Sequence, residues 1–446
     1  MKKMFVILLC KLLYRAGKIV GKGSSLPGRI ALKLDPQILS EIQLPSCIAA
    51  VTGSNGKTST VEMIAHILQQ NGKKVAYNKE GSNQIEGVTT FLLNDCNWKG
   101  HARSEIILLE SDERFARHTF QYFTPTHYVI TNLYRDQLTR NGHPEWVYDI
   151  VKESIHEGTQ LILNADDPLV SCFGLGRQNT VWFGVERMDF SEQKNTSVYD
   201  DGKYCPNCKS PMQYEYYHYN HIGKYRCPSC GLARHDPDFA VTQADLKQKY
   251  IVINGKYRID MAFPGIYHCY NALAAFSLCS LLGVPQQEAA ASLNRYILKN
   301  GRVVTFRCGE REGMLLASKH ENSVSYDQSI CVAVGDGRNV SVMIIVDAVS
   351  RKYFTSETSW LWDIDFERLN VPNVSQVILA GRYCNDLAVR FSCTGIPQER
   401  IAVYEDIGQA EQDFREHGKG YLYVITCFSD KEKFLDKVEL EGGTEK

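Results

Sequence analysis

The feature that most constrains this chain is a glycine-rich segment, Val51-Thr-Gly-Ser-Asn-Gly-Lys-Thr-Ser59. It follows the apolar run Ile48–Val51 and precedes a segment with helical periodicity that begins at Val61. A strand, a glycine loop and a helix in this order form a phosphate-binding loop, where backbone N–H groups and a helix N-terminus surround a polyphosphate. The alternative is a chance glycine-rich turn, but Gly-Lys-Thr in this context favours phosphate binding.

Phosphate binding would give each residue of this loop a role. Lys57 would reach the β- and γ-phosphates, and Thr58 would bind Mg²⁺. Val51 stands where the common motif has its first glycine, so the loop is a variant of that motif. The predicted nucleotide-binding residues of the loop are Gly53, Ser54, Asn55, Gly56, Lys57, Thr58 and Ser59.

The variant loop resembles the ATP loop of the Mur ligases, a family that builds bacterial cell-wall precursors. Four more segments resemble motifs of this family, in the family's order. Polar groups that follow parallel strands suit the sheet edge where ligands bind in open α/β folds. The four segments are Glu110-Ser-Asp-Glu113, Thr131-Asn-Leu-Tyr-Arg-Asp136, Asn164-Ala-Asp-Asp-Pro168 and the predicted helix start at Gly265–Ala275.

The resemblance implies roles for further residues. Glu110 would bind Mg²⁺ together with Thr58, and Asn271 would contact adenine. Asp136 and Arg302 would lie near the phosphates; the alternatives are a turn cap for Asp136 and a linker salt bridge for Arg302. The reaction implied is ATP-dependent amide ligation, in which Lys57 and Mg²⁺ stabilise the transferring phosphoryl group.

Two Cys-x-x-Cys pairs, Cys205 with Cys208 and Cys227 with Cys230, predict a second site. Their spacing is typical of a zinc site in which four thiolates close a tetrahedral shell, so the zinc would be structural. Two redox-active pairs are the alternative, but neither pair opens a helix of a thioredoxin-like unit. The tyrosines between the pairs favour a small β-hairpin. The other cysteines are scattered singly, which favours free thiols in a reducing cytoplasm.

Length and charge narrow the class of protein. A chain of 446 residues should form two or three domains. Its 44% hydrophobic and 23% charged residues are typical of a soluble globular protein. With a net charge of −1, no global field favours nucleic acid.

The N-terminal segment up to Lys33 is basic and contains no acidic residue. Its apolar core, Met4–Cys10, is too short for an export signal or a membrane span. Two interpretations of the predicted helix stay open: it lies on an anionic membrane, or it packs on the main domain with a solvated basic face. The basic face comprises Lys11, Arg15, Lys18 and Lys22, and the apolar positions are Phe5, Leu8, Leu9, Leu12, Leu13 and Ile19.

The segment before the phosphate loop is too short for the N-terminal domain with which most Mur ligases bind a UDP-linked substrate. This feature, the Cys₄ insertion and the C-terminal region resemble the MurT branch, the ligase subunits of lipid II isoglutaminyl synthase. Gly23–Pro36, Ser359–Glu367 and Ala380–Arg390 carry this resemblance. It implies a heterodimer with a GatD-like glutaminase, lipid II as acceptor, and a location in the cytoplasm, at the inner membrane face if the basic helix binds there.

The implied mechanism is phosphorylation of a D-glutamate α-carboxyl by ATP, followed by attack of ammonia on the acyl phosphate. The chain has no Gly-x-Cys-x-Gly glutaminase motif, so ammonia would come from the partner. MurT proteins lend the partner's Cys–His pair an acidic residue, and Glu357 stands where the family has Asp. The predicted catalytic residues are therefore Lys57, Glu110 and Glu357. Val349–Glu357 and Lys319–Asn322 depart from the family pattern, which predicts a change in the partner interface, in the acceptor, or in both.

The expected fold is α/β: a Mur-ligase-type ATP-binding domain with an inserted Cys₄ zinc ribbon, followed by a C-terminal Rossmann-like domain. Alternating strands and helices predict mostly parallel sheets. The expected parts are a basic helix and arm (1–45), the ATP-binding domain (46–300, with the ribbon at about 200–236), the C-terminal domain (301–438) and a loose tail (439–446).

Three hypotheses of function follow. The first is a MurT-like amidotransferase subunit. The second is a divergent Mur-type ligase that uses another carboxylate acceptor or another amine. The third is a non-ligase, either an ATP-binding scaffold or an ATPase that contacts nucleic acid through the ribbon. Because the ribbon carries acidic as well as basic residues, it lacks the basic excess that nucleic-acid binding requires, and no such contact is expected.

Overall fold

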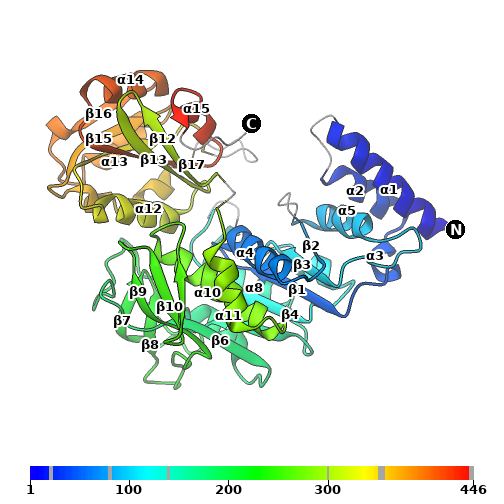
Figure 1. Ribbon diagram of the computed structural model, residues 1–446. Helices are drawn as coiled ribbons and strands as arrows, with labels where there is room; N and C mark the ends of the chain where they lie inside the picture. Colours follow the sequence, from blue (N-terminus) through cyan, green and yellow to red (C-terminus); the bar gives the residue numbers. More distant parts are fainter. Residues whose placement is uncertain (20–23, 79–82, 138–140, 299–300, 350–356, 441–446) are drawn as a thin grey trace.

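The computed structural model of the chain describes residues 1–19, 24–78, 83–137, 141–298, 301–349 and 357–440. Two large sheets, each covered by helices, form the two lobes of the molecule (Figure 1). A two-stranded sheet, β7 (Gln213–Tyr219) with β8 (Ile222–Arg226), lies in the Cys₄ segment. The predicted α/β class is confirmed. None of the described helices is long and apolar enough to cross a membrane.

The first sheet has nine strands in the order β11-β10-β9-β6-β5-β4-β1-β3-β2. Along this order, neighbouring strands pair in parallel from β2 as far as β9. Strand β10 pairs antiparallel with both β9 and β11. The strands are β1 (Cys47–Thr52), β2 (Val75–Tyr77), β3 (Ile106–Glu110), β4 (His127–Ile130), β5 (Gln160–Asn164), β6 (Thr180–Val185), β9 (Phe239–Asp245), β10 (Tyr250–Ile253) and β11 (Tyr257–Asp260).

Helices cover both faces of this sheet because its central strands are apolar on both sides, as buried parallel strands are. In β1, Ala49 and Val51 face one core and Ile48 and Ala50 face the other. The first core is covered by α4 (Lys57–Gln70), α10 (Ile266–Leu281) and α11 (Gln286–Asn294). The second is covered by α1 (Lys2–Ile19), α2 (Leu26–Leu34), α3 (Ile38–Glu41), α5 (Ile85–Asp95), α6 (Ala116–Phe120), α8 (Pro144–Lys152) and α9 (Pro168–Ser171).

The N-terminal segment forms three helices where the sequence predicted one helix and an arm. The residues expected to form the arm are largely helical, in α2 and α3. Helix α1 packs on the main domain through Val6, Ile7 and Cys10, each at most 1% exposed. Lys22, predicted to complete the basic face, lies outside the described residues.

The second sheet has seven strands in the order β16-β15-β14-β17-β13-β12-β18, parallel from β16 to β13. Glu439 and Leu440 form β18 against β12, so ordered chain extends past the expected start of the tail; residues 441–446 lie outside the description. The elements are β12 (Val303–Cys308), β13 (Arg311–Ser318), α12 (Ser323–Gly335), β14 (Val340–Ile345), β15 (Val374–Ala380), α13 (Cys384–Phe391), β16 (Ile401–Tyr404), α14 (Ile407–His417), β17 (Tyr421–Cys427), α15 (Lys431–Leu435) and β18 (Glu439–Leu440).

A buried ion pair ties the first sheet to the Cys₄ segment. Asp166 follows β5, is fully buried, and accepts a hydrogen bond from the Arg234 guanidinium at 2.5 Å. The Tyr270 hydroxyl on α10 and the Val185 N–H on β6 also donate to this carboxylate, at 2.6 and 2.7 Å. Burial opposes the charged guanidinium, but Asp166 outweighs this and raises the pKa of Arg234 above its ordinary value.

Removing one partner of this pair leaves a buried charge without compensation. We expect Asp166→Ala to lower the free energy of unfolding by about 3–5 kcal/mol, measured as a fall in Tm in thermal unfolding. Asp260→Ala is the matched control, because the Arg258–Asp260 pair is exposed and should contribute little. Equal shifts in the two variants would contradict a structural role for the buried pair.

Candidate nucleotide site and Cys₄ centre

The predicted phosphate loop connects β1 to α4 at the C-terminal edge of the first sheet, and α4 begins at Lys57. Gly53 and Gly56 have φ angles of +135° and +84°, which favour glycine. A Cβ atom on Gly56 would lie 2.0 Å from the Asn271 Oδ1 of α10. The structure thus places Asn271, the predicted adenine contact, directly against the loop.

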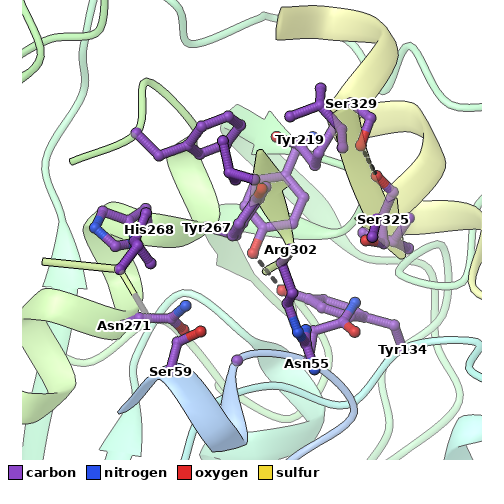
Figure 2. A pocket seen from close by; sticks show the side chains of 18 residues that line it. Asn55, Ser59, Tyr134, Tyr219, Tyr267, His268, Asn271, Arg302, Ser325 and Ser329 are labelled. Carbon is purple, nitrogen blue, oxygen red and sulfur yellow. Dashed lines mark hydrogen bonds between the residues drawn. The ribbon is translucent and has the colours of Figure 1, made fainter. Parts of the chain in front are cut away.

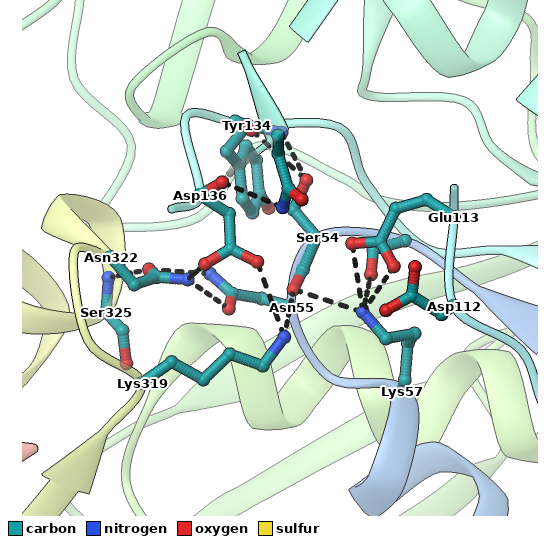
Figure 3. Close-up of polar contacts among 12 residues, drawn as sticks. Ser54, Asn55, Lys57, Asp112, Glu113, Tyr134, Asp136, Lys319, Asn322 and Ser325 are labelled. Carbon is teal, nitrogen blue, oxygen red and sulfur yellow. Dashed lines mark hydrogen bonds and ion pairs between the residues drawn. The ribbon is translucent and has the colours of Figure 1, made fainter. Parts of the chain in front are cut away.

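Lys57 is a buried cation held among carboxylates (Figure 3). Its Nζ lies 2.9 Å from Glu113 Oε2 and also contacts the Gly53 carbonyl oxygen. Burial opposes the charged amine, but Glu113 and Asp136 raise the pKa of Lys57 above its ordinary value. Burial raises the pKa of Glu113, while Lys57 opposes that rise. The sequence analysis did not assign Glu113, although it ends the same acidic motif as Glu110.

Glu110 and Thr58 lie beside the loop. Glu110 is the last residue of β3 and pairs with Val51 in the parallel register, while Thr58 is the second residue of α4. The Glu110 carboxylate accepts a hydrogen bond from Asn83 at 3.4 Å. Glu110, Asp112 and Glu113 are all buried. Because carboxylate and hydroxyl oxygens are the ligands that Mg²⁺ prefers, these residues fit the predicted magnesium site.

Two residues of the second lobe contact both the phosphate loop and Asp136. Lys319 Nζ, just after β13, lies 3.0 Å from the Ser54 carbonyl oxygen and 3.4 Å from Asp136 Oδ2. Asn322 donates to Asp136 Oδ1 at 2.8 Å and to Asn55 Oδ1 at 2.7 Å. Burial lowers the pKa of Lys319, and Asp136 opposes this shift. The Asp136 carboxylate therefore joins the two lobes, and its role goes beyond capping a turn.

A pocket lies between the two lobes (Figure 2). Five of the predicted nucleotide-binding residues line it, and Arg302 is among them, so its position agrees with a ligand-facing role better than with a linker salt bridge. Burial lowers the pKa of His268 to about 4, so this ring is neutral near pH 7. The lining includes Asn55, Gly56, Ser59, Asn271 and Arg302, together with Tyr134, Tyr219, Tyr267 and His268.

One wall of the pocket comes from the Cys₄ segment. Tyr219 ends β7 (Gln213–Tyr219), which pairs with β8 (Ile222–Arg226) in the predicted hairpin. Its hydroxyl bonds that of Tyr134, and the two rings meet edge to face with centroids 5.9 Å apart. The sequence analysis assigned neither Tyr134 nor Tyr219 to the site. The hairpin that carries Tyr219 was predictable, but the direction in which it folds back onto the pocket was not.

The four cysteines converge as predicted, with all four Sγ atoms within 4.8 Å of one another. Each pair is followed by a residue with positive φ, Lys209 at 61° and Gly231 at 78°. The N–H groups of these two residues donate to the Cys205 and Cys227 carbonyl oxygens. Two matching turns therefore direct four thiols to one point, which fits tetrahedral zinc.

Glu357 lies in the second lobe, exposed, and does not line the pocket. Its Oε1 accepts a hydrogen bond from the Ser359 N–H at 2.8 Å, at the start of the 3₁₀ helix Ser359–Asp363. Hydrogen bonds from Ser359 lower the pKa of the Glu357 carboxyl. Residues 350–356 of the preceding loop lie outside the described residues.

Comparison with known proteins decides the family. Residues 51–279 match the Mur ligase middle domain, and residues 320–430 match the MurT ligase C-terminal domain. Over 99% of its length, the chain is 30% identical to the whole MurT subunit of a lipid II isoglutaminyl synthase (glutamine-hydrolyzing) of Staphylococcus aureus strain COL. The chain belongs to the MurT family of Mur ligases. It is therefore an ATP-dependent ligase of the Mur type. The MurT subunit of Streptococcus pneumoniae is 29% identical over 94% of this chain and 92% of its own.

Solved structures share the fold of this chain at low sequence identity. A pseudomurein peptide ligase type C from Methanothermus fervidus matches with a TM-score of 0.69 and 20% identity, over 90% of this chain and 81% of its own. The MurF ligase of Thermotoga maritima in complex with ADP matches with a TM-score of 0.59 and 16% identity, over 92% and 83%. These matches establish the Mur ligase fold.

The contact between Gly56 and Asn271 leaves no room for a side chain. We expect Gly56→Ala to weaken ATP binding at least about tenfold, because the new methyl group would displace Asn271 and strain the loop. The measurement is isothermal titration calorimetry. Gly72→Ala is the control: it has a similar φ of +72° but no atom within 4 Å of the added Cβ. Equal losses in both variants would indicate backbone strain alone.

Tyr219 links the Cys₄ segment to the pocket, because it ends β7 of that segment and lines the pocket. We expect Cys205→Ser to lose bound zinc, measured by atomic absorption, and to weaken ATP binding, because the hairpin would no longer hold Tyr219 against Tyr134. Cys393→Ser, which changes an exposed cysteine outside the ribbon, should alter neither property. Loss of zinc with unchanged ATP affinity would contradict the link.

Proposed function

We propose that this chain is the ligase subunit that amidates the α-carboxyl of D-glutamate in the lipid II stem peptide, giving D-isoglutamine. The observation that carries the proposal is the phosphate loop facing Lys319 and Asn322 of the second lobe. It occurs in a chain similar along its length to MurT subunits of lipid II isoglutaminyl synthase.

The proposed reaction has two steps. A carboxylate oxygen of the acceptor attacks the γ-phosphorus of ATP, the bond to the β-phosphate oxygen breaks, and ADP leaves. Ammonia then attacks the carbonyl carbon of the acyl phosphate, loses a proton, and expels inorganic phosphate. The first step requires two anionic reactants, the carboxylate and ATP, to be held together, so the site must supply positive charge where the phosphoryl group moves.

Lys57 and Lys319 supply this charge from the two lobes. The raised pKa of Lys57 keeps its amine charged at neutral pH. Because Glu113 is its partner in the structure, phosphate oxygens would share Lys57 with that carboxylate. The hydrogen bond from Asn322 to Asp136 joins the two lobes at this point, and Lys319 lies beside the loop next to it.

The same edge suits a divalent cation. Glu110 and Thr58 would hold Mg²⁺, which when bound neutralises phosphate charge during transfer. Four carboxylates, Glu110, Asp112, Glu113 and Asp136, lie close enough to raise the pKa of Lys57. Carboxylate oxygens are ligands that Mg²⁺ prefers, which supports a cation site here.

The adenine would lie between Asn271 and the pocket tyrosines. The Asn271 amide can both donate and accept, as an adenine edge requires. The neutral His268 adds no charge to this end of the pocket, and the rings of Tyr134, Tyr219 and Tyr267 offer apolar faces for a base. The zinc would be structural, holding the hairpin that carries Tyr219.

Ammonia would come from a GatD-like glutaminase bound as a heterodimer in the cytoplasm. Glu357 supports this part of the proposal because it is exposed and its lowered pKa keeps it ionised at neutral pH. An ionised carboxylate is what a Cys–His pair needs to orient its histidine. A glutamate is one methylene longer than the family's aspartate, so the partner's histidine would lie correspondingly further from the backbone of this loop.

The test is mass spectrometry of lipid II incubated with ATP, Mg²⁺, this chain and a co-expressed glutaminase partner. We expect acid-to-amide conversion on the stem glutamate, with glutamine or free ammonia as nitrogen source. Lys57→Ala should abolish both reactions because the phosphoryl group loses its buried cation. Glu357→Gln should reduce only the glutamine reaction, by about 10²-fold or more, since it leaves the nucleotide site intact.

Other outcomes would assign a different function. Conversion with ammonia alone would indicate a ligase whose partner contact has changed. No conversion with either nitrogen source, in a protein that binds ATP normally, would exclude this acceptor and favour a Mur-type ligase for another carboxylate.

A further inference from the structure

Helix α1 carries an exposed apolar stripe on the side opposite its core contacts. We call Phe5, Leu8, Leu12 and Ile19 the outer stripe; they are 60%, 50%, 65% and 87% exposed. Their spacing places them on one face of a helix with 3.6 residues per turn. Four large apolar side chains are thus exposed to water along one helix face, and exposed apolar surface of this kind typically marks an interaction site.

The fold fixes the stripe in its outward position. Val6, Ile7 and Cys10 are buried in the core shared with α2 and α5. Lys11 Nζ donates to the carbonyl oxygens of Asn94 and Cys96, at 2.8 and 2.6 Å, at the end of α5. Rotation of the helix would break these contacts. The outer stripe is therefore a constant feature of the folded chain.

Positive charge surrounds the outer stripe. Lys2, Arg15 and Lys18 are exposed on the same helix, and the chain has no acidic residue before Asp35. Asp35 is itself 3% exposed and pairs with Lys2 at 3.4 Å. An apolar stripe flanked by cations, on a helix that itself has no acidic residue, matches the interface of a bilayer with anionic headgroups.

We propose that the outer stripe docks this protein on an anionic lipid bilayer. Phe5, Leu8, Leu12 and Ile19 enter the boundary between headgroups and acyl chains, while Arg15 and Lys18 contact lipid phosphates. The helix lies in the membrane plane, since no described helix can span a bilayer. The helix then packs on the main domain through its buried face and docks on lipid through the opposite face.

The position of α1 leaves the nucleotide site free. Figure 1 shows α1 at the outer edge of the first lobe, beside α2 and α5 and away from the second lobe. The pocket between the lobes is lined by none of the residues of α1, so docking through α1 uses a different surface. The docking does not depend on which carboxylate the enzyme amidates, so it can fail or succeed independently of the proposed reaction.

The test is co-sedimentation of the full chain with vesicles. We expect binding to vesicles of phosphatidylglycerol and phosphatidylcholine, weaker binding at raised salt, and little binding to phosphatidylcholine alone. The double variant Leu8→Glu with Leu12→Glu should reduce the partition coefficient at least about tenfold. Val389→Glu with Val403→Glu, which changes apolar residues of the second lobe that are 61% and 41% exposed, is the matched control.

Two further measurements keep the test decisive. Unchanged Tm and ATP affinity in the Leu8 and Leu12 variant would establish that it is folded. Absent binding to anionic vesicles, or equal binding by this variant and the parent chain, would overturn the proposal. Light scattering tests whether a second copy of the chain packs on the outer stripe instead. If the parent chain is a dimer, the variant is a monomer and neither binds vesicles, the outer stripe is a contact between two copies.

Discussion

The structure depends on a positive charge held out of water at the C-terminal edge of the first sheet. Lys57 is 5% exposed, and a buried ammonium requires carboxylates around it. Those carboxylates come from the ends of neighbouring strands: Glu113 follows β3 and Asp136 follows β4. The order of strands in the sheet is thus what makes the charge of Lys57 tolerable, and the phosphate loop takes its conformation around that side chain.

The second lobe enters this balance through Lys319 and Asn322. Asp136 accepts hydrogen bonds from both, so one carboxylate serves the buried lysine of the first lobe and the contacts of the second. A site made from two lobes in this way can respond to its ligand, because an anion that competes for Lys319 also alters the contacts that hold the lobes together. The hairpin between the two cysteine pairs adds a third contributor, because its Tyr219 lines the same pocket.

Much of the site was predictable because its signals are local. The loop around Lys57, the acidic motif at Glu110 and the paired cysteines each lie within a few residues of sequence. Glu113, Lys319 and Tyr219 were not assigned, because the importance of each comes from a partner far along the chain. The Asn55–Asn322 contact, for example, spans 267 positions. The helix α1 was predicted, but which of its faces would be buried was not. An amphipathic pattern does not show against which other elements a helix packs.

The sequence by itself determined the elements whose physics is short-range: a glycine loop between an apolar strand and a helix, four thiols in two turns, and alternating strands and helices that require parallel sheets. Only the tertiary structure decided which side chains meet. It placed Asn271 against Gly56, joined Asp136 to Lys319, turned Tyr219 into the pocket and left the outer stripe of α1 in water. Local pattern fixes backbone conformation, whereas charge compensation and burial are set by neighbours that only the complete fold brings together.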